Sequence, residues 1–439
     1  MIRILKTAKQ ISEFISSLDA RMPSENEEVV QSVRNIVSAV RSKGRQAVLE
    51  LRQAFEGVPE QTQLHYSREE LMPLAESCPS AVRKVLCKSI DRVRRYHQIQ
   101  RDETRWMGLG TSRFASRVQP LDSVALYVPG GKAFYPSSVI MSAVPAQVAG
   151  VRRMAVFTPA RSILDPVFAA TVCELGIDEV FAVGGAQAVA LAAFGDEHTK
   201  RFDKIVGPGN IYVATAKQLL AGRIGIDGFA GPSEILVLSD GSSPAQWIAL
   251  DMLAQAEHDE DASSILVTTS EREAENVAAE LSNLIDKVCT DRAHIARKSL
   301  EQWGAVCVVR SRDEMVEIAN ALNAEHLHVQ TQCALDADNG QAYWLNSLRG
   351  AGAIFLGRWS AESFGDYLAG PSHVLPTAGT ARFASPLGVY DFVRRSSVLA
   401  LSAEDSRALA EDTAVFADAE QLWAHAAAAR ARLNPEVQR

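Results

Sequence analysis

Hydrophobic residues recur at spacings of three and four in the first quarter of the chain, with polar or basic residues between them. The two clearest stripes are Val29, Val33, Ile36, Val37 and Val40, followed by Val82, Leu86, Ile90 and Val93. This spacing places apolar side chains on one face of a helix, where they pack against a core. Residues 1 to about 120 are therefore predicted to be mainly helical, and the polar stretch of residues 56 to 65 is predicted to be a loop.

From residue 123 onward, short runs rich in β-branched residues alternate with helical stretches. The predicted strands are Ser123–Val128, Met154–Thr158, Glu179–Val183, Lys204–Val206, Glu234–Leu238 and Ser264–Thr268. The predicted helices between them are Ser137–Ala149, Leu164–Leu175, Gln187–Phe194, Tyr212–Leu220 and Ala245–Glu257. This alternation indicates βαβ units and hence an α/β fold, with mostly parallel strands and helices on both faces. Ligands of such folds bind at the carboxyl ends of the strands.

A region of different composition begins after about residue 380. Ala403–Arg432 is rich in Ala, Glu and Arg, which together strongly favour a helix. An Ala-rich tail of this kind is typical of a packing or oligomerisation element.

Length and charge narrow the class of protein. The 439 residues suggest two or three domains. Lys and Arg number 45 against 53 Asp and Glu, a net charge of −8, which argues against nucleic acid as the main partner. No run reaches the roughly 18 apolar residues of a membrane span, and charged residues interrupt the N-terminal stretch where a secretory signal would be apolar.

The cysteines form no motif. They are Cys78, Cys87, Cys173, Cys289, Cys307 and Cys333. Without a C-x-x-C pair or regular spacing, neither a disulfide framework nor a thiolate zinc site is predicted. A reducing cytoplasm is the simplest location.

Glycine-rich turns mark several predicted strand and helix boundaries. They are Pro129-Gly130-Gly131, Gly184-Gly185, Gly207-Pro208-Gly209-Asn210 and Gly231-Pro232-Ser233. Where a helix follows such a turn, its free N–H groups can bind an anion such as a pyrophosphate. Four turns within about a hundred residues favour a nucleotide or dinucleotide, although the G-x-G-x-x-G fingerprint and the P-loop are absent and any single turn could be a plain connection.

Histidines lie close to carboxylates or amides in four short polar islands. The islands are Gln255-Ala256-Glu257-His258, Glu325-His326, Asp366 with His373, and Glu420 with His425. Imidazole and carboxylate groups both bind divalent metals, yet a single histidine is more often an ordinary surface or hydrogen-bonded residue, so spacing alone gives only a weak metal signal. Glu325 and His326 could form a general-base pair, or they could simply end a helix. No nucleophile elbow is present, which argues against an acyl-enzyme mechanism.

At these islands the chain resembles the histidinol dehydrogenases. The matching segments are LYVPGGKAFYPSSVIMSAVPAQVAGV (126–151), VGGAQAVA (183–190), DKIVGPGNIYVATAK (203–217), IDGFAGPSEILV (226–237), AQAEHDEDA (254–262), AEHL (324–327), GAIFLG (352–357), GDYLAGPSHVLPT (365–377) and AEQLWAH (419–425). They occur in the family's order, and ordered matches over 300 residues are highly specific. The more divergent N-terminal third is compatible with the family.

The resemblance implies a zinc-dependent enzyme that oxidises L-histidinol through L-histidinal to L-histidine with two NAD⁺, the last step of histidine biosynthesis. The implied zinc ligands, which also contact substrate, are Gln255, His258, Asp366 and His425. The implied acid–base residues are Glu325 and His326, with His326 also touching substrate. The other implied substrate contacts are Ser233, His373 and Glu420, and the implied NAD contacts are Tyr127, Gln187 and Asn210.

The resemblance also implies an organisation. We expect two incomplete Rossmann-like domains and a homodimer in which each tail supplies its glutamate and histidine to the partner's site. The expected parts are a helical segment 1–22, a first α/β domain 23–126 with 238–380, a second α/β domain 127–237 carrying the NAD loops, and a dimerisation tail 381–439.

The chain departs from the family pattern at two positions. Ala324 stands where the family usually has Pro, which removes a fixed φ before the Glu-His pair, and Ser372 stands where it usually has Asn. A paralogous zinc and NAD enzyme acting on another polar alcohol is the nearest alternative. A more distant alternative is a non-catalytic nucleotide-binding protein. Such a protein would be expected to have lost one or more of His258, Glu325, His326 and Asp366, and this chain retains all four. The same donors would also accept manganese.

Overall fold

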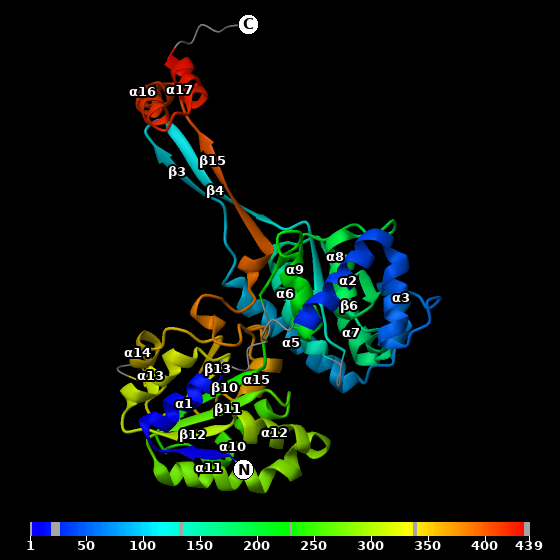
Figure 1. Cartoon of the computed structure of the whole chain (residues 1–439), viewed down its shortest axis with the longest axis vertical. Coiled ribbons are helices and arrows are strands. Elements are labelled where there is room, and N and C mark those ends of the chain that lie inside the picture. The colour runs from blue at the N-terminus through cyan, green and yellow to red at the C-terminus, as the bar shows by residue number, and fades with distance from the viewer. Residues whose placement is uncertain (1, 19–26, 131–134, 229–230, 337–339, 434–439) are drawn as a thin grey trace. The chain divides into compact units, whose positions relative to one another are not determined.

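The computed structural model describes residues 2–18, 27–130, 135–228, 231–336 and 340–433 (Figure 1). The chain forms two compact units. The larger unit comprises Met1–Gln100 and Leu121–Phe392, and the smaller unit comprises Arg101–Pro120 and Val393–Arg439.

The first sheet of the larger unit has six strands in the order β2-β7-β6-β5-β8-β9. Their bounds are His65–Ser67 (β2), Ser123–Tyr127 (β5), Arg153–Thr158 (β6), Glu179–Ala182 (β7), Lys204–Val206 (β8) and Gly225–Ile226 (β9). All neighbours are parallel except β2, which pairs antiparallel with β7. The strand order reverses between β5 and β8, the point at which open α/β sheets bind ligands.

Helices cover both faces of this sheet because alternate strand residues point to opposite sides. Ala125 and Phe157 pack in the core beneath Glu27–Lys43 (α2), Arg45–Glu56 (α3), Gly185–Phe194 (α8) and Ile211–Leu220 (α9). Leu126 and Val156 pack in the core beneath Arg68–Glu76 (α4), Ser80–Gln98 (α5), Pro136–Ala149 (α6) and Pro166–Glu174 (α7). Strands buried on both faces read as continuous apolar runs, which is how β5 and β6 were predicted.

The second sheet has six parallel strands in the order β1-β12-β11-β10-β13-β14. Their bounds are Arg3–Leu5 (β1), Glu234–Ser239 (β10), Ser263–Thr268 (β11), Ala305–Val308 (β12), His326–Gln330 (β13) and Ala353–Leu356 (β14). One face is covered by Ala8–Leu18 (α1), Arg312–Leu322 (α13) and Gly340–Ser347 (α14), and the other by Ala245–Ala256 (α10), Glu271–Val288 (α11) and Ala293–Trp303 (α12) (Figure 1). The short helix Glu362–Tyr367 (α15) follows β14.

Strand β13 is apolar on one face and polar on the other. Leu327 and Val329 join the core under α13 and α14. His328 and Gln330 alternate with them and meet Asp251 of α10, at 3.5 Å from the Nδ1 of His328 and 2.7 Å from the Nε2 of Gln330. The face of β13 that begins with His326 therefore carries polar side chains, and these side chains lie against α10.

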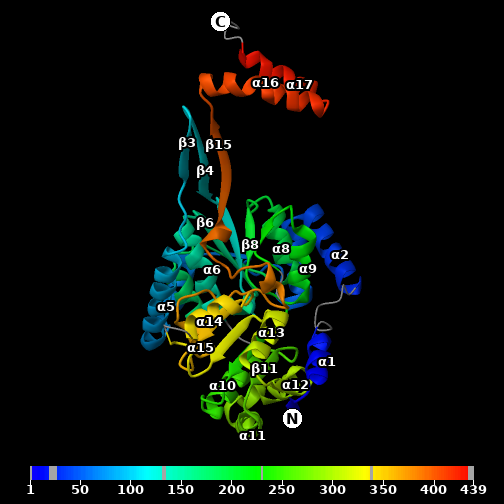
Figure 2. The same ribbon diagram turned by 90° about the vertical axis from the view of Figure 1, so that its left-hand side faces the viewer.

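The smaller unit contains an antiparallel sheet in the order β15-β4-β3 and two helices packed on each other (Figure 2). Their bounds are Arg105–Leu109 (β3), Ser112–Pro120 (β4), Val393–Ala400 (β15), Ala403–Ala419 (α16) and Trp423–Arg430 (α17). The prediction of mainly helix up to residue 120 is wrong for β3 and β4. Every residue of β3 is exposed, so this strand has no alternation of buried and exposed positions that a sequence pattern could reveal.

Short 3-10 helices complete the secondary structure. They are Ala160–Leu164 (η2), Thr290–Arg292 (η3), Thr380–Arg382 (η4), Val389–Phe392 (η5) and Ala431–Leu433 (η6). None of the helices in the described ranges is both long and apolar enough to cross a membrane. All six cysteines are free, in line with the absence of a disulfide motif. The α/β class with parallel sheets is confirmed.

Candidate functional site

The candidate site is a cavity of about 520 Å³ within the larger unit, between the ends of the two sheets. The first sheet contributes the carboxyl ends of β5 and β8, through Pro129 and Gly207-Pro208. The second sheet contributes the amino ends of β10 and β13, through Ser233 and Glu325-His326. The candidate site thus lies at the carboxyl ends of the strands in the first sheet and at the amino ends in the second, where the polar residues precede the strands.

Glu325 and His326 are both buried at the start of β13. The Oε2 of Glu325 accepts a hydrogen bond from the N–H of Glu234 at 2.9 Å, and the Nδ1 of His326 lies 3.2 Å from the carbonyl oxygen of Glu234. Donation from Nδ1 to that carbonyl leaves Nε2 as the basic nitrogen. The alternative reading of this pair as the end of a helix is wrong, because β13 begins here.

Burial keeps the His326 imidazole neutral. It lowers the pKa of His326 to about 4 because the charged ring loses its hydration, even though the charge of Asp366 acts in the opposite direction. A neutral imidazole can accept a proton from a bound hydroxyl at neutral pH.

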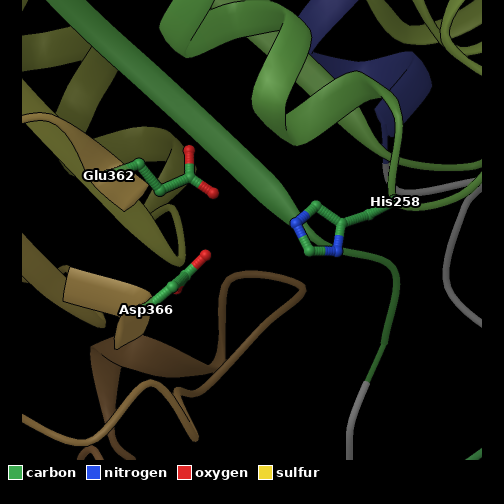
Figure 3. A group of neighbouring side chains, drawn as sticks. All are labelled: His258, Glu362 and Asp366. Carbon is green, nitrogen blue, oxygen red and sulfur yellow. The ribbon is translucent and has the colours of Figure 1, made fainter. Parts of the chain in front are cut away.

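Three side chains beside this pair form a cluster suited to a metal ion. One nitrogen of His258 and one carboxylate oxygen each of Glu362 and Asp366 lie within 4.8 Å of one another (Figure 3). Glu362 and Asp366 are four residues apart on α15, so they share a face, and His258 comes from the turn after α10. Imidazole nitrogen and carboxylate oxygen, each about 2 Å from an ion, would have this spacing, so the donors fit zinc.

Glu362 is a site residue that the sequence reasoning missed. It is 1% exposed, and its pKa is raised well above the usual range by burial and then by the charges of Asp366, Glu325 and Asp251. The signal that could have found it is its four-residue spacing from Asp366.

Gln255 connects the cluster to the acid–base pair. With its amide nitrogen turned toward the neighbouring oxygens, that nitrogen lies 3.1 Å from the Oε1 of Glu362 and 3.2 Å from the carbonyl oxygen of Glu234, and it also lies 3.1 Å from the Nδ1 of His326. Its two hydrogens suffice for the two oxygens. The amide oxygen is then left for another partner.

The remaining expected substrate residues of the larger unit, Ser233 and His373, line the same cavity as Gln255, His258, His326 and Asp366. Burial lowers the pKa of His373. Ser372, which departs from the family pattern, donates its hydroxyl to the carbonyl of Met141 at 3.2 Å and accepts from the N–H of Val374, so it fastens the His373 loop to α6. Ala324 is buried, and its carbonyl accepts from Gly352 at 3.0 Å.

The three expected NAD residues lie at the carboxyl ends of β5, β7 and β8, outside the lining of the cavity. Tyr127 is buried, which raises the pKa of its hydroxyl to about 12, and that hydroxyl accepts from the N–H of Gly185. Gln187 is buried in the first turn of α8. Asn210 is exposed and caps α9, accepting from the N–H of Val213 at 3.2 Å.

Three N–H groups of the glycine turns donate hydrogen bonds within the chain. Gly184 donates to the Oε1 of Glu56 at 2.8 Å, and Gly207 donates to the Oδ2 of Asp227 at 2.7 Å. Gly231 donates to the Oγ1 of Thr377 at 2.6 Å. Gly131 lies outside the described residues. At these three glycines, carboxylate or hydroxyl groups from other segments accept the bonds that an anion could otherwise accept.

Gly207 also has a steric role. Its φ of +112° belongs to the left-handed side of the Ramachandran plot, and a Cβ there would lie 2.1 Å from the carbonyl oxygen of Tyr127. The loop after β8 can approach β5 this closely only with glycine. The buried Lys217 fixes the loop by donating to the carbonyl of Gly207 at 3.0 Å and by pairing with Asp227.

Glu420 and His425 belong to the smaller unit. Glu420 ends α16, His425 lies in α17, and both are exposed. Gln421 between the helices has a φ of +60°, so the predicted helical tail is broken beside the two residues. Large apolar side chains around them are also exposed: Val415, Phe416, Leu422 and Trp423.

Comparisons with known proteins show which family the chain is similar to. A family model described as histidinol dehydrogenase matches residues 19–433. A histidinol dehydrogenase of Pseudomonas aeruginosa is 46% identical over 415 residues, covering 94% of this chain and 92% of the relative. One of Nitrosomonas europaea is 43% identical and covers 98% of this chain and 100% of the relative. A crystal structure of histidinol dehydrogenase from Elizabethkingia anophelis superposes with a TM-score of 0.90 at 27% identity, with 98% of each chain covered.

Proposed function

The chain belongs to the histidinol dehydrogenase family, NAD-dependent oxidoreductases of histidine biosynthesis that act on histidinol, and from this premise we propose which residues perform the oxidation. The observation that carries the proposal is the meeting of Glu325 and His326 with His258 and Asp366 in one cavity. These pairs are far apart in the sequence, and each supplies a different part of the chemistry.

His326 is the base of the first oxidation. Its neutral ring removes the hydroxyl proton of histidinol while a hydride leaves the same carbon, which gives histidinal. The carbonyl of Glu234 holds Nδ1 and so fixes the ring with Nε2 as acceptor. NAD⁺ supplies the hydride acceptor in each of the two oxidations.

Glu325 acts between the two oxidations. Its carboxylate activates a water molecule that adds to the aldehyde, giving the hydrate. His326 then removes a hydroxyl proton from the hydrate as the second hydride leaves, and the product is the acid. Overall, one alcohol and one water yield one carboxylic acid, two protons and two hydrides. Each hydride passes to one NAD⁺, and the two protons that His326 removes are released to solvent, so the atoms and electrons balance.

We propose that one zinc ion per subunit is bound by four side chains: Gln255, His258, Asp366 and His425. Glu362 holds the amide nitrogen of Gln255, and this leaves the amide oxygen for the metal. When bound, zinc would supply a fixed positive charge that grips the amine and imidazole nitrogens of the substrate. The chain's own part is to bring the His258 imidazole and the Asp366 carboxylate close together, with the Gln255 amide lining the same cavity.

Ser233 and His373 are proposed to hold the substrate, because both line the cavity beside His326. Tyr127, Gln187 and Asn210 are proposed to position NAD. Tyr127 and Gln187 are buried, so they support the shape of the cofactor loops, while the exposed Asn210 is free to touch the cofactor through its remaining polar atoms. Both sheets contain the strand order of a Rossmann-like half, with β5 and β10 at the centre, which supports that part of the proposed fold.

We propose that the active form is a homodimer in which Glu420 and His425 complete the partner's site. The exposed apolar residues around them, Phe416, Leu422 and Trp423 among others, support this because such a patch on a tail normally contacts another chain. We propose that the chain divides into four parts: residues 1–22, residues 23–126 with 238–380, residues 127–237 and residues 381–439. The compactness of the smaller unit supports a separate tail, but that unit also includes Arg101–Pro120, which the division places in the first α/β domain.

Zinc removal tests the proposed chemistry. Chelation of the metal is expected to abolish histidinol oxidation, and addition of zinc is expected to restore it. Full activity after complete removal of zinc would contradict a role for the metal. The oxidation would then depend on the acid–base pair alone.

A further inference from the structure

Two turns carry His258 and Asp366. Side chains from other segments of the chain donate hydrogen bonds to the main-chain carbonyls of each turn. His258 follows α10 directly, and Asp366 lies in the last turn of α15. The final carbonyls of a helix have no hydrogen-bond partners within the helix, so the backbone there can fray. A metal-binding side chain at the end of a helix is then poorly fixed. What these carbonyls bond to therefore decides how well the ligand is placed.

Arg292 holds the turn of His258. Its Nε donates to the carbonyl of Glu257 at 2.9 Å and its Nη2 to the carbonyl of His258 at 3.2 Å. Arg292 ends η3, which lies 34 residues further along the chain and leads into α12. A guanidinium is a rigid fork that can reach two neighbouring carbonyls at once, and its charge suits the carboxyl end of α10.

Helix α5 holds the turn after Asp366 in the same way. The hydroxyl of Ser89 donates to the carbonyl of Tyr367 at 2.6 Å, and the Nε of Arg92 donates to the carbonyl of Leu368. Ser89 and Arg92 are three residues apart and so lie on one face of α5. Neither residue takes part in the chemistry proposed above.

The two sets of contacts border a common cavity of about 330 Å³. Its lining includes Ser89 and Leu368 from one set, and Glu257 and Arg292 from the other, with His258 between them. The space behind His258 is therefore not filled by a packed core. The main-chain bonds from Arg292 therefore help to fix the position of this ligand beside the open space.

We infer that Arg292 and Arg92 are positioning residues that preset the separation of His258 and Asp366 before the metal binds. The inference rests on the proposed zinc site. Without these bonds the two turns would have to be ordered at the moment of binding, and the loss of freedom would weaken zinc affinity.

The direct test is zinc affinity, measured by competition with a chelating dye, for wild type, R292M and R92M. Substitution of partners that orient metal ligands typically weakens affinity about 10- to 100-fold, and this is expected for both variants. R297M is the matched control, since Arg297 lies on α12 next to η3 but pairs on the surface with Asp286 at 2.8 Å. Its zinc affinity should stay within about twofold of wild type. R292K restores one donor and should recover part of the affinity.

The melting temperature of the metal-free protein separates positioning from general stability. If R292M melts earlier but each folded molecule binds zinc as tightly as wild type, Arg292 is merely structural and the inference is wrong. Wild-type zinc affinity in R292M and R92M without a change in melting would also overturn it. If wild type itself binds no zinc, both the proposed zinc site and this inference are wrong. That result is distinct from a loss of zinc affinity in the variants alone.

Discussion

The Nδ1 of His326 lies 3.6 Å from the Oε2 of Glu325, its neighbour in the chain. Adjacent residues within a strand point to opposite faces, but Glu325 precedes β13 and can turn back toward β10. Both side chains then bond to the backbone of Glu234, one to its N–H and the other to its carbonyl. One residue of the neighbouring strand thus sets the geometry of the acid–base pair.

Replacement of Glu362 by Ala is expected to weaken zinc affinity about 10- to 100-fold, because the amide of Gln255 loses the acceptor that orients it. E362Q keeps an acceptor oxygen at this position and should lose less. Competition with a chelating dye measures both, and E317A, a change of an exposed glutamate on α13, is the control. Equal zinc affinity in wild type and E362A would show that Glu362 does not orient the ligand.

The metal-free protein is expected to lose stability at acidic pH through His326. The pKa of His326 is about 4 in the fold, below its ordinary 6.5, so between these values the unfolded chain binds a proton that the folded chain does not. Stability is therefore unaffected above pH 6.5 and falls as the pH drops toward 4. Linkage gives about 2 kcal/mol between pH 8 and pH 5 for this one group.

Urea unfolding in the presence of a chelator measures this effect. Wild type should lose about 2 kcal/mol more of its free energy of unfolding than H326Q over that pH range. H294Q, which removes an exposed imidazole from α12, is the comparison. Parallel pH dependences of wild type and H326Q would mean that His326 is not held neutral by burial.

The shared site is expected to show subunit complementation. Inactive H326A and inactive H425A chains are mixed and allowed to exchange subunits. A heterodimer then contains one site with both defects and one site with neither, so up to half of the activity of a wild-type dimer should return in each heterodimer. If activity stays absent although mass spectrometry confirms exchange, each site is built within a single chain.

The βαβ region could be predicted closely from the sequence. Lys204–Val206 was placed at the residues that β8 occupies, and Glu234–Leu238 falls one residue short of β10. Such strands are buried on both faces, and glycine or proline marks their ends, so local pattern and tertiary environment agree. The strands of the smaller unit could not be found in this way, because β3 and most of β15 are exposed.

The site followed from the family resemblance rather than from local pattern. Residue spacing alone left His258 and Asp366 as weak metal candidates, since 108 positions separate them. The use of the Gly184 and Gly207 N–H groups could not be foreseen, because their acceptors, Glu56 and Asp227, come from other segments. The four-residue spacing of Glu362 from Asp366 is visible in the sequence, but its place beside His258 is seen only in the fold.

The decisive measurement is the stoichiometry of NADH formed per L-histidinol consumed by the zinc-loaded protein, with L-histidine identified as product. Two NADH per histidinol are expected, and H326Q should slow turnover by about 100- to 10,000-fold while its zinc content stays at one per subunit. One NADH per histidinol, with histidinal accumulating, or no turnover of histidinol at all, would contradict the four-electron oxidation assigned to Glu325 and His326.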